Sequence, residues 1–169
     1  AARRLVEGDR YARSEQFTVY DPGYILGCEV HSSTLGIVGL GRIGYQVARR
    51  ARGFDMNVLY CNRRRRVEIE AELGARHTSF DELLAESDYV ILCCPLSAET
   101  RSLIDARAFS RMKSTAVLVN IARGPVVDTA ALVAALQAGR IAAAGLDVTD
   151  PEPLPRDHAL LSLPNVVIA

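Results

Sequence analysis

Short apolar runs recur along this chain and alternate with segments of helical spacing. The runs are TLGIVGL, MNVLYC, DYVILCC, TAVLVNI, IAAAGLDV and NVVIA. Strands that are apolar on both faces are typical of a parallel sheet that helices cover on both sides. The chain of 169 residues is long enough to bury a sizeable core as one domain. The sequence therefore predicts an α/β fold with a doubly wound parallel sheet.

The segments between the apolar runs carry start and stop signals for helices. RIGYQVARRARGF has helical spacing and ends near Gly53, and VEIEAELG ends at Gly74. Ser79 and Glu82 form a capping box at the start of SFDELLAES, and Asp128 caps TAALVAALQAG. DARAFSRM is predicted as a further helix. AARRLVEGDRYARSEQF is predicted as a short amphipathic helix that precedes the first strand.

A G-x-G-x-x-G motif, formed by Gly39, Gly41 and Gly44, follows the first apolar run and opens the next helix. Glycines at these positions allow a tight turn, close approach of the backbone to a pyrophosphate, and close packing of helix on strand. The N–H groups at the start of the helix attract the anion. A structural turn with incidental glycines is the alternative. The context predicts a Rossmann-type fold that binds a dinucleotide.

The end of the second strand bears on which dinucleotide is bound. NAD-binding domains usually place an acidic residue there, on the ribose 2′-hydroxyl. This chain has Asn62 at that position, followed by Arg63 and Arg64. Asparagine does not repel a 2′-phosphate, and guanidinium groups bind phosphate through charge-assisted hydrogen bonds. The sequence predicts NADP(H) in preference to NAD(H), read by Arg63 and Arg64, with Arg65 and Arg66 at the next helix start or in solvent.

Two further loops place charged residues beyond the ends of predicted strands. Arg123 follows the strand in TAVLVNI, Asp147 ends the strand in IAAAGLDV, and Glu152 lies five residues later in a proline-rich loop. Ligands of open α/β sheets bind at this edge, and prolines stiffen a loop that positions a carboxylate. Taken singly, each of these charges could equally be a surface charge on a rigid connection.

The bulk composition bears on several classes of function. Twenty Lys and Arg residues balance twenty Asp and Glu residues, which disfavours a nucleic-acid partner. No apolar run approaches the length of a membrane span. The four cysteines form neither a CxxC pair nor a cluster with zinc spacing, so no metal site is predicted. We expect them to be reduced, buried side chains of a cytoplasmic protein.

Several long motifs in order resemble the D-isomer-specific 2-hydroxyacid dehydrogenase family. They are TLGIVGLGRIG, CCPLSAETRSLID, NIARGPVVDTAALVAAL, GRIAAAGLDV and PEPLP. The form GLDVTDPEPLP, with arginines after the second strand, is similar to the glyoxylate/hydroxypyruvate reductase branch. The resemblance implies hydride transfer between a nicotinamide and a small-molecule 2-oxo acid.

The resemblance also implies roles for individual residues. Arg123 matches the family's catalytic arginine, which binds the substrate carboxylate and polarises its carbonyl. Glu152 matches the acid that pairs with the catalytic histidine. The remaining matches concern the cofactor: Arg42 and Ile43 for the pyrophosphate, Pro95 and Ile121 for the walls of the cleft, Asp147 for the nicotinamide carboxamide, and Thr100 as the cap of a helix near the cofactor.

The family's histidine follows the strand that matches NVVIA, and the chain stops at Ala169. His31, His77 and His158 do not match that histidine. We therefore expect residues 1–27 to be a linker helix and connection, and residues 28–169 to be the cofactor domain, without the substrate domain. Such a fragment should bind nucleotide but turn over little substrate. The family also implies a homodimer formed through the cofactor domain.

Two alternatives remain open at this point. The first is another substrate within the same family, such as phosphoglycerate, lactate, formate or phosphite. The second is a non-catalytic, dehydrogenase-like corepressor, although the presence of both Arg123 and Glu152 disfavours it.

Overall fold

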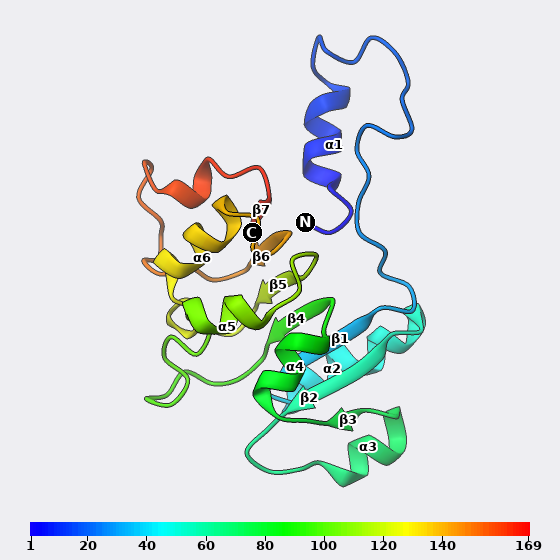
Figure 1. The fold of residues 1–169 in the computed structure, drawn as a ribbon, viewed down its shortest axis with the longest axis vertical. Helices are drawn as coiled ribbons and strands as arrows, with labels where there is room; N and C mark the ends of the chain where they lie inside the picture. Colours follow the sequence, from blue (N-terminus) through cyan, green and yellow to red (C-terminus); the bar gives the residue numbers. More distant parts are fainter.

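All 169 residues are described by the computed structural model, which is built around one seven-stranded parallel sheet (Figure 1). The strand order is β3-β2-β1-β4-β5-β6-β7. The order reverses direction at β1, which is the mark of a doubly wound sheet. This confirms the predicted Rossmann-type fold. The strands are β1 Thr34–Val38, β2 Asn57–Cys61, β3 Arg76–His77, β4 Tyr89–Leu92, β5 Val117–Asn120, β6 Ala143–Leu146 and β7 Val166–Ile168.

Helices connect the strands where the sequence predicted them. The α-helices are α1 Leu5–Ala12, α2 Arg42–Ala51, α3 Val67–Leu73, α4 Phe80–Glu86, α5 Ala106–Arg111 and α6 Thr129–Gln137. Three short 3-10 helices are η1 Arg52–Phe54, η2 Gly124–Val126 and η3 Ala159–Leu161. The predicted capping box of Ser79 and Glu82 opens α4, and the Asp128 side chain caps α6. Gly74 ends α3 with φ of 68°, a conformation that favours glycine.

Two hydrophobic clusters pack against the two faces of the sheet. On one face, α4, α5 and α6 pack over side chains that include Val90, Leu92 and Leu118. On the other face, α2 and α3 pack over alternate residues of the same strands, including Tyr89 and Val117. Since successive side chains of a strand point to opposite faces, one apolar run supplies both clusters. The continuous apolar runs therefore reflect burial on both faces.

The segment with α1 projects from the sheet, and a long connection runs back from it to β1 (Figure 1). No residue of α1 is buried. Within this segment, the Tyr11 ring lies 5.4 Å from that of Phe17 and 4.5 Å from that of Tyr24 between ring centroids. The Cys28 N–H donates to the Ala2 carbonyl, which ties the two ends of this segment together. No helix has the length and apolar character needed to span a membrane.

Candidate cofactor and catalytic site

The predicted site residues follow the carboxyl ends of neighbouring strands. The register aligns Val38 of β1 with Cys61 of β2 and Leu92 of β4. It likewise aligns Asn120 of β5 with Leu92 and with Leu146 of β6. The residues just beyond these ends therefore share one edge of the sheet, where parallel α/β proteins bind ligands. They include Gly39, Asn62, Pro95, Ile121 and Asp147.

The glycine turn has the shape that a pyrophosphate requires. Gly39 has φ of +100°, and a Cβ there would lie 2.7 Å from the Cys94 nitrogen. A Cβ on Gly44 would lie 2.4 Å from the Gly39 carbonyl oxygen. At Gly41, by contrast, an added Cβ would meet nothing within 4 Å. No side chain caps the N-terminus of α2, where the exposed Arg42 and Ile43 lie. Gly39 and Gly44 thus allow close packing, while Gly41 leaves open space at the start of α2 that fits a phosphate group.

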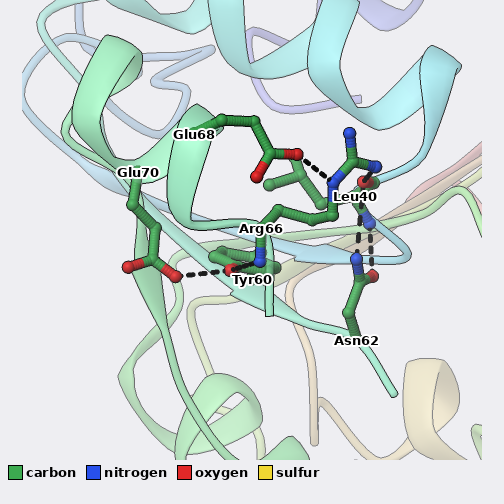
Figure 2. A network of polar contacts seen from close by, with 6 residues as sticks. All are labelled: Leu40, Tyr60, Asn62, Arg66, Glu68 and Glu70. Carbon is green, nitrogen blue, oxygen red and sulfur yellow. Dashed lines mark hydrogen bonds and ion pairs between the residues drawn. The ribbon is translucent and has the colours of Figure 1, made fainter. Parts of the chain in front are cut away.

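Asn62 is bound to the glycine turn through both ends of its amide. Its Oδ1 accepts from the Leu40 N–H at 2.6 Å, and its Nδ2 donates to the Leu40 carbonyl at 3.4 Å. Figure 2 shows this pair of contacts, with Arg66 reaching the same carbonyl. The side chain at the position of the usual acid is therefore used to fix the turn, a contact that the linear sequence did not suggest.

The four consecutive arginines fall into two pairs. Arg63 and Arg64 are exposed, and their guanidinium groups make no hydrogen bond or ion pair within the chain. Arg65 binds the Glu70 carboxylate with its Nε and Nη2, and Arg66 binds Glu68 at 2.6 Å. Arg66 directly precedes α3, as predicted. Only Arg63 and Arg64 therefore keep their whole guanidinium groups free for a ligand.

The buried side chain of Tyr60 holds the arginine loop through two hydrogen bonds. Tyr60 is fully buried, and its hydroxyl donates to Glu70 at 2.6 Å and accepts from the Arg66 N–H at 2.7 Å (Figure 2). The hydrogen bonds from Arg65 and then from Tyr60 lower the pKa of Glu70 to about 2. The loop between β2 and α3 is consequently held by an ionised carboxylate and a buried hydroxyl.

The loop that carries Arg123 is shaped by a residue that the sequence analysis did not select. Asn120 is buried, and its amide accepts from the Ala122 N–H and donates to the Arg123 carbonyl, both at 3.0 Å. The Arg123 side chain is exposed, with Nη1 donating to the Ala122 carbonyl at 2.7 Å. An asparagine at the end of a buried strand, ahead of a glycine-proline turn, was the available signal.

Gly124 brings the Arg123 loop against the loop that follows β6. A Cβ on Gly124 would lie 1.9 Å from the Thr149 carbonyl oxygen, so no larger residue fits. A cavity of about 600 Å³ lies beside this contact, and Asp147 and Glu152 share its lining with Ile168 and Ala169. Both carboxylates are exposed and lack hydrogen bonds to the protein. The structure therefore brings Asp147 and Glu152 together and places Arg123 on the adjoining loop.

The loop after β4 corrects one prediction. Thr100 does not cap a helix, because the next helix, α5, begins at Ala106 and is capped by Asp105. Instead, the Thr100 hydroxyl donates to the Pro95 carbonyl and accepts from the Ser97 N–H, each at 2.7 Å. A short polar side chain can close a turn as readily as it caps a helix, and the sequence did not distinguish the two. The exposed Pro95 thus belongs to a loop that closes on itself.

The cysteines near this edge are free thiols with little nucleophilic character. Cys61, Cys93 and Cys94 are half-buried, and burial raises the pKa of each thiol, that of Cys93 to about 11. No group of three or more His, Cys, Asp or Glu residues could hold a metal ion.

The fold and site define a Rossmann-type dinucleotide-binding domain. Residues 1–169 match the family described as D-isomer specific 2-hydroxyacid dehydrogenase, NAD binding domain. This chain belongs to that family.

Relatives in sequence include a glyoxylate reductase of Thermococcus kodakarensis, 52% identical over 99% of this chain and 51% of the relative. A glyoxylate/hydroxypyruvate reductase B of Citrobacter koseri is 51% identical over 98% of this chain and 52% of the relative. The chain thus spans about half the length of the curated relatives it matches.

Solved structures agree with this assignment. A protein of Thermus thermophilus superposes with a TM-score of 0.93 at 48% identity, covering 99% of this chain and 52% of its own. An acyclic imino acid reductase in complex with NADPH and D-Arg superposes with a TM-score of 0.87 at 32% identity, over 99% of this chain and 52% of its own. A D-lactate dehydrogenase with NAD+ from Lactobacillus jensenii also superposes with a TM-score of 0.87 at 32% identity, over 99% of this chain and 53% of its own.

Proposed function

We propose that this chain is the cofactor-binding half of a reductase that uses NADPH to convert glyoxylate or hydroxypyruvate to the corresponding 2-hydroxy acid. The substrate class is supported by relatives named as glyoxylate and glyoxylate/hydroxypyruvate reductases, which are 52% and 51% identical to this chain. On this proposal, residues 28–169 form the cofactor domain, residues 1–27 form a linker, and a substrate domain lies outside the chain.

The single observation that carries the cofactor preference is the state of the loop after β2. Arg63 and Arg64 are exposed and make no hydrogen bond or ion pair, and the neighbouring Asn62 is neutral and held on the glycine turn. An acid at this position would repel a 2′-phosphate, whereas two free guanidinium groups attract it. A bound 2′-phosphate would also reduce the repulsion between the positive charges of the two arginines.

The bound nicotinamide would supply the hydride, and residues of this chain would position the partners. The forked donors of Arg123 suit the substrate carboxylate and the oxygen of its carbonyl, where charge develops during reduction. Asp147, at the end of β6, would accept from the carboxamide. Glu152 would orient the proton-donating histidine that the family resemblance implies and raise its pKa. Asn120 and Gly124 fix the backbone that carries Arg123.

Two further features belong to the same proposal. Large apolar side chains on the N-terminal segment are exposed, Leu5 at 77%, Tyr20 at 79% and Val19 at 70%. Covering such side chains is a reason for a second copy of this chain to pack there in a homodimer. Four free cysteines support a reducing compartment, and we infer the cytoplasm.

Titration of the chain with NADPH and NADH tests the cofactor preference. We expect tighter binding of NADPH, by about tenfold or more, since charge-assisted hydrogen bonds to a phosphate distinguish the two. The double variant Arg63→Ala/Arg64→Ala should lose most of this preference and keep its affinity for NADH. Arg140→Ala, an exposed arginine that precedes β6 at the opposite edge, is the control for net charge. Equal affinities in the unaltered chain would refute the proposal.

A further inference from the structure

The guanidinium group of Arg66 lies between the glycine turn and the loop after β2. Its Nη1 donates to the Leu40 carbonyl at 3.4 Å, beside the contact that Asn62 makes with the same oxygen (Figure 2). Its Nε donates to Glu68 at 2.6 Å. Leu40 separates the first two glycines of the motif, so this cation borders the turn as well as the arginine loop.

The guanidinium group of Arg66 has donors to spare. A guanidinium carries five N–H groups, and the contacts with Leu40 and Glu68 use two of them. The side chain is 40% exposed, so the remaining donors can reach a ligand. Arg65 differs, because its Nε and Nη2 make three contacts with one carboxylate, that of Glu70. Of the two paired arginines, Arg66 alone touches the glycine turn.

We propose that Arg66 is a third specificity-determining arginine, which donates to the cofactor's 2′-phosphate from the glycine-turn side while Glu68 holds it in place. This inference rests on the proposed preference for NADPH and adds a residue that the linear pattern assigned to a helix start or to solvent. Arg63 and Arg64 approach the same phosphate from the loop.

The contacts of Arg66 reduce the entropy that binding costs. A flexible surface arginine loses rotamer freedom when it binds an anion, whereas Arg66 is already held by Leu40 and Glu68. Glu68 has a second effect. The hydrogen bond from Arg66 lowers the pKa of Glu68, so its carboxylate is charged at neutral pH and competes with a phosphate for the same cation. Glutamine can still accept the hydrogen bond from Arg66 but carries no charge, so Glu68→Gln should keep Arg66 in place and tighten phosphate binding.

Fragments of the cofactor isolate the 2′-phosphate in the test. The chain is titrated with adenosine 2′,5′-bisphosphate and with adenosine 5′-monophosphate, which differ only in that group. Arg66→Ala should weaken the bisphosphate by about tenfold and the monophosphate by less than about twofold. Glu68→Gln should change the bisphosphate affinity in the opposite direction. Arg65→Gln removes the same charge from the neighbouring residue but leaves an amide that can still donate to Glu70, so it is the matched control. It should weaken binding of the bisphosphate by no more than about twofold.

Each contrary result has a separate meaning. Equal binding of the two fragments by the unaltered chain would overturn the proposed NADPH preference. A clear preference that survives in Arg66→Ala would overturn only the role of Arg66. Equal weakening of both fragments by Arg66→Ala would show that it merely supports the glycine turn. An equal loss in Arg65→Gln would show that the arginine run acts through undirected charge, which also overturns the inference.

Discussion

Two regions at the carboxyl ends of the strands, the β1–β2 half and the β5–β6 half, differ in how many hydrogen bonds their side chains make with one another. At the β1–β2 half, Asn62 and Arg66 both bind Leu40, and Tyr60, Glu70 and Arg65 form a continuous network. At the β5–β6 half, the hydrogen bonds shape the backbone instead. Arg123, Asp147 and Glu152 present exposed side chains there without partners among one another.

This difference indicates a division of work. The β1–β2 half is preorganised, so it can recognise part of a ligand with little rearrangement. The β5–β6 half has a rigid frame, set by Asn120 and Gly124, on which charged groups remain available for a substrate or for other side chains. We therefore expect changes in the first half to alter affinity for the cofactor, and changes in the second to alter turnover.

The largest expected effect follows from Arg123→Lys in a full-length enzyme that carries this chain. Lysine keeps the charge but lacks the planar fork that can bind a carboxylate and a carbonyl oxygen together. We expect kcat/KM for glyoxylate to fall by about 10²- to 10³-fold. The dissociation constant of NADPH, measured alongside by fluorescence, should stay constant. A parallel loss of cofactor affinity would remove the proposed division between the halves.

Gly124→Ala tests the frame of the β5–β6 half. The added Cβ would lie 1.9 Å from the Thr149 carbonyl oxygen, so the two backbone segments would have to move apart. We expect the free energy of unfolding in urea to fall by about 3 kcal/mol. Gly8→Ala is the control, because a Cβ there meets nothing within 4 Å and alanine favours the helix α1. Similar stability of the two variants would contradict the close contact between the loops.

Gly41→Ala probes the open space at the start of α2 in the β1–β2 half. The new methyl group meets nothing within 4 Å in the folded chain, so unfolding should change by no more than about 1 kcal/mol, the scale of a lost N-cap preference. The methyl group would occupy space that we assign to the pyrophosphate. NADPH and NADH should therefore both weaken by about tenfold, measured by calorimetry. Weaker binding of only one of the two cofactors would show that the space at Gly41 receives another part of the cofactor than the pyrophosphate.

The smallest effect concerns the pH dependence of the network around Glu70. Its pKa is lowered from 4.5 to about 2, mainly by Arg65 and then by Tyr60. The ionised contact therefore stabilises the fold above pH 4.5, and this contribution is lost as the pH falls towards 2. The difference in urea midpoint between the unaltered chain and Glu70→Gln should shrink over that range. A difference that is constant with pH would show that ionisation of Glu70 plays no part.

Much of the fold could be predicted because the signals were local. The glycine motif, the capping box of Ser79 and the terminal Gly74 each act over a few residues, and the structure confirms them. The two-residue strand β3 was missed, because it exists only through pairing with β2 and has no apolar run of its own. Thr100 was misassigned for a different reason, since a short polar side chain closes a turn as readily as it caps a helix, and here it binds the Pro95 carbonyl.

The sequence by itself determined the order along the chain of the helices and of every strand except β3. It also determined the glycine turn and the placement of Asn62, Arg123 and Glu152 beyond strand ends. These follow from periodicity and from residues whose conformational preferences are strong. Only the tertiary structure decided what each side chain meets. Leu40 and Asn62 are separated by 22 positions, and Gly124 and Thr149 by 25, yet they touch. Such contacts depend on strand register and loop path, so the division of the arginines and the contact between the loops that carry Gly124 and Thr149 required the folded chain.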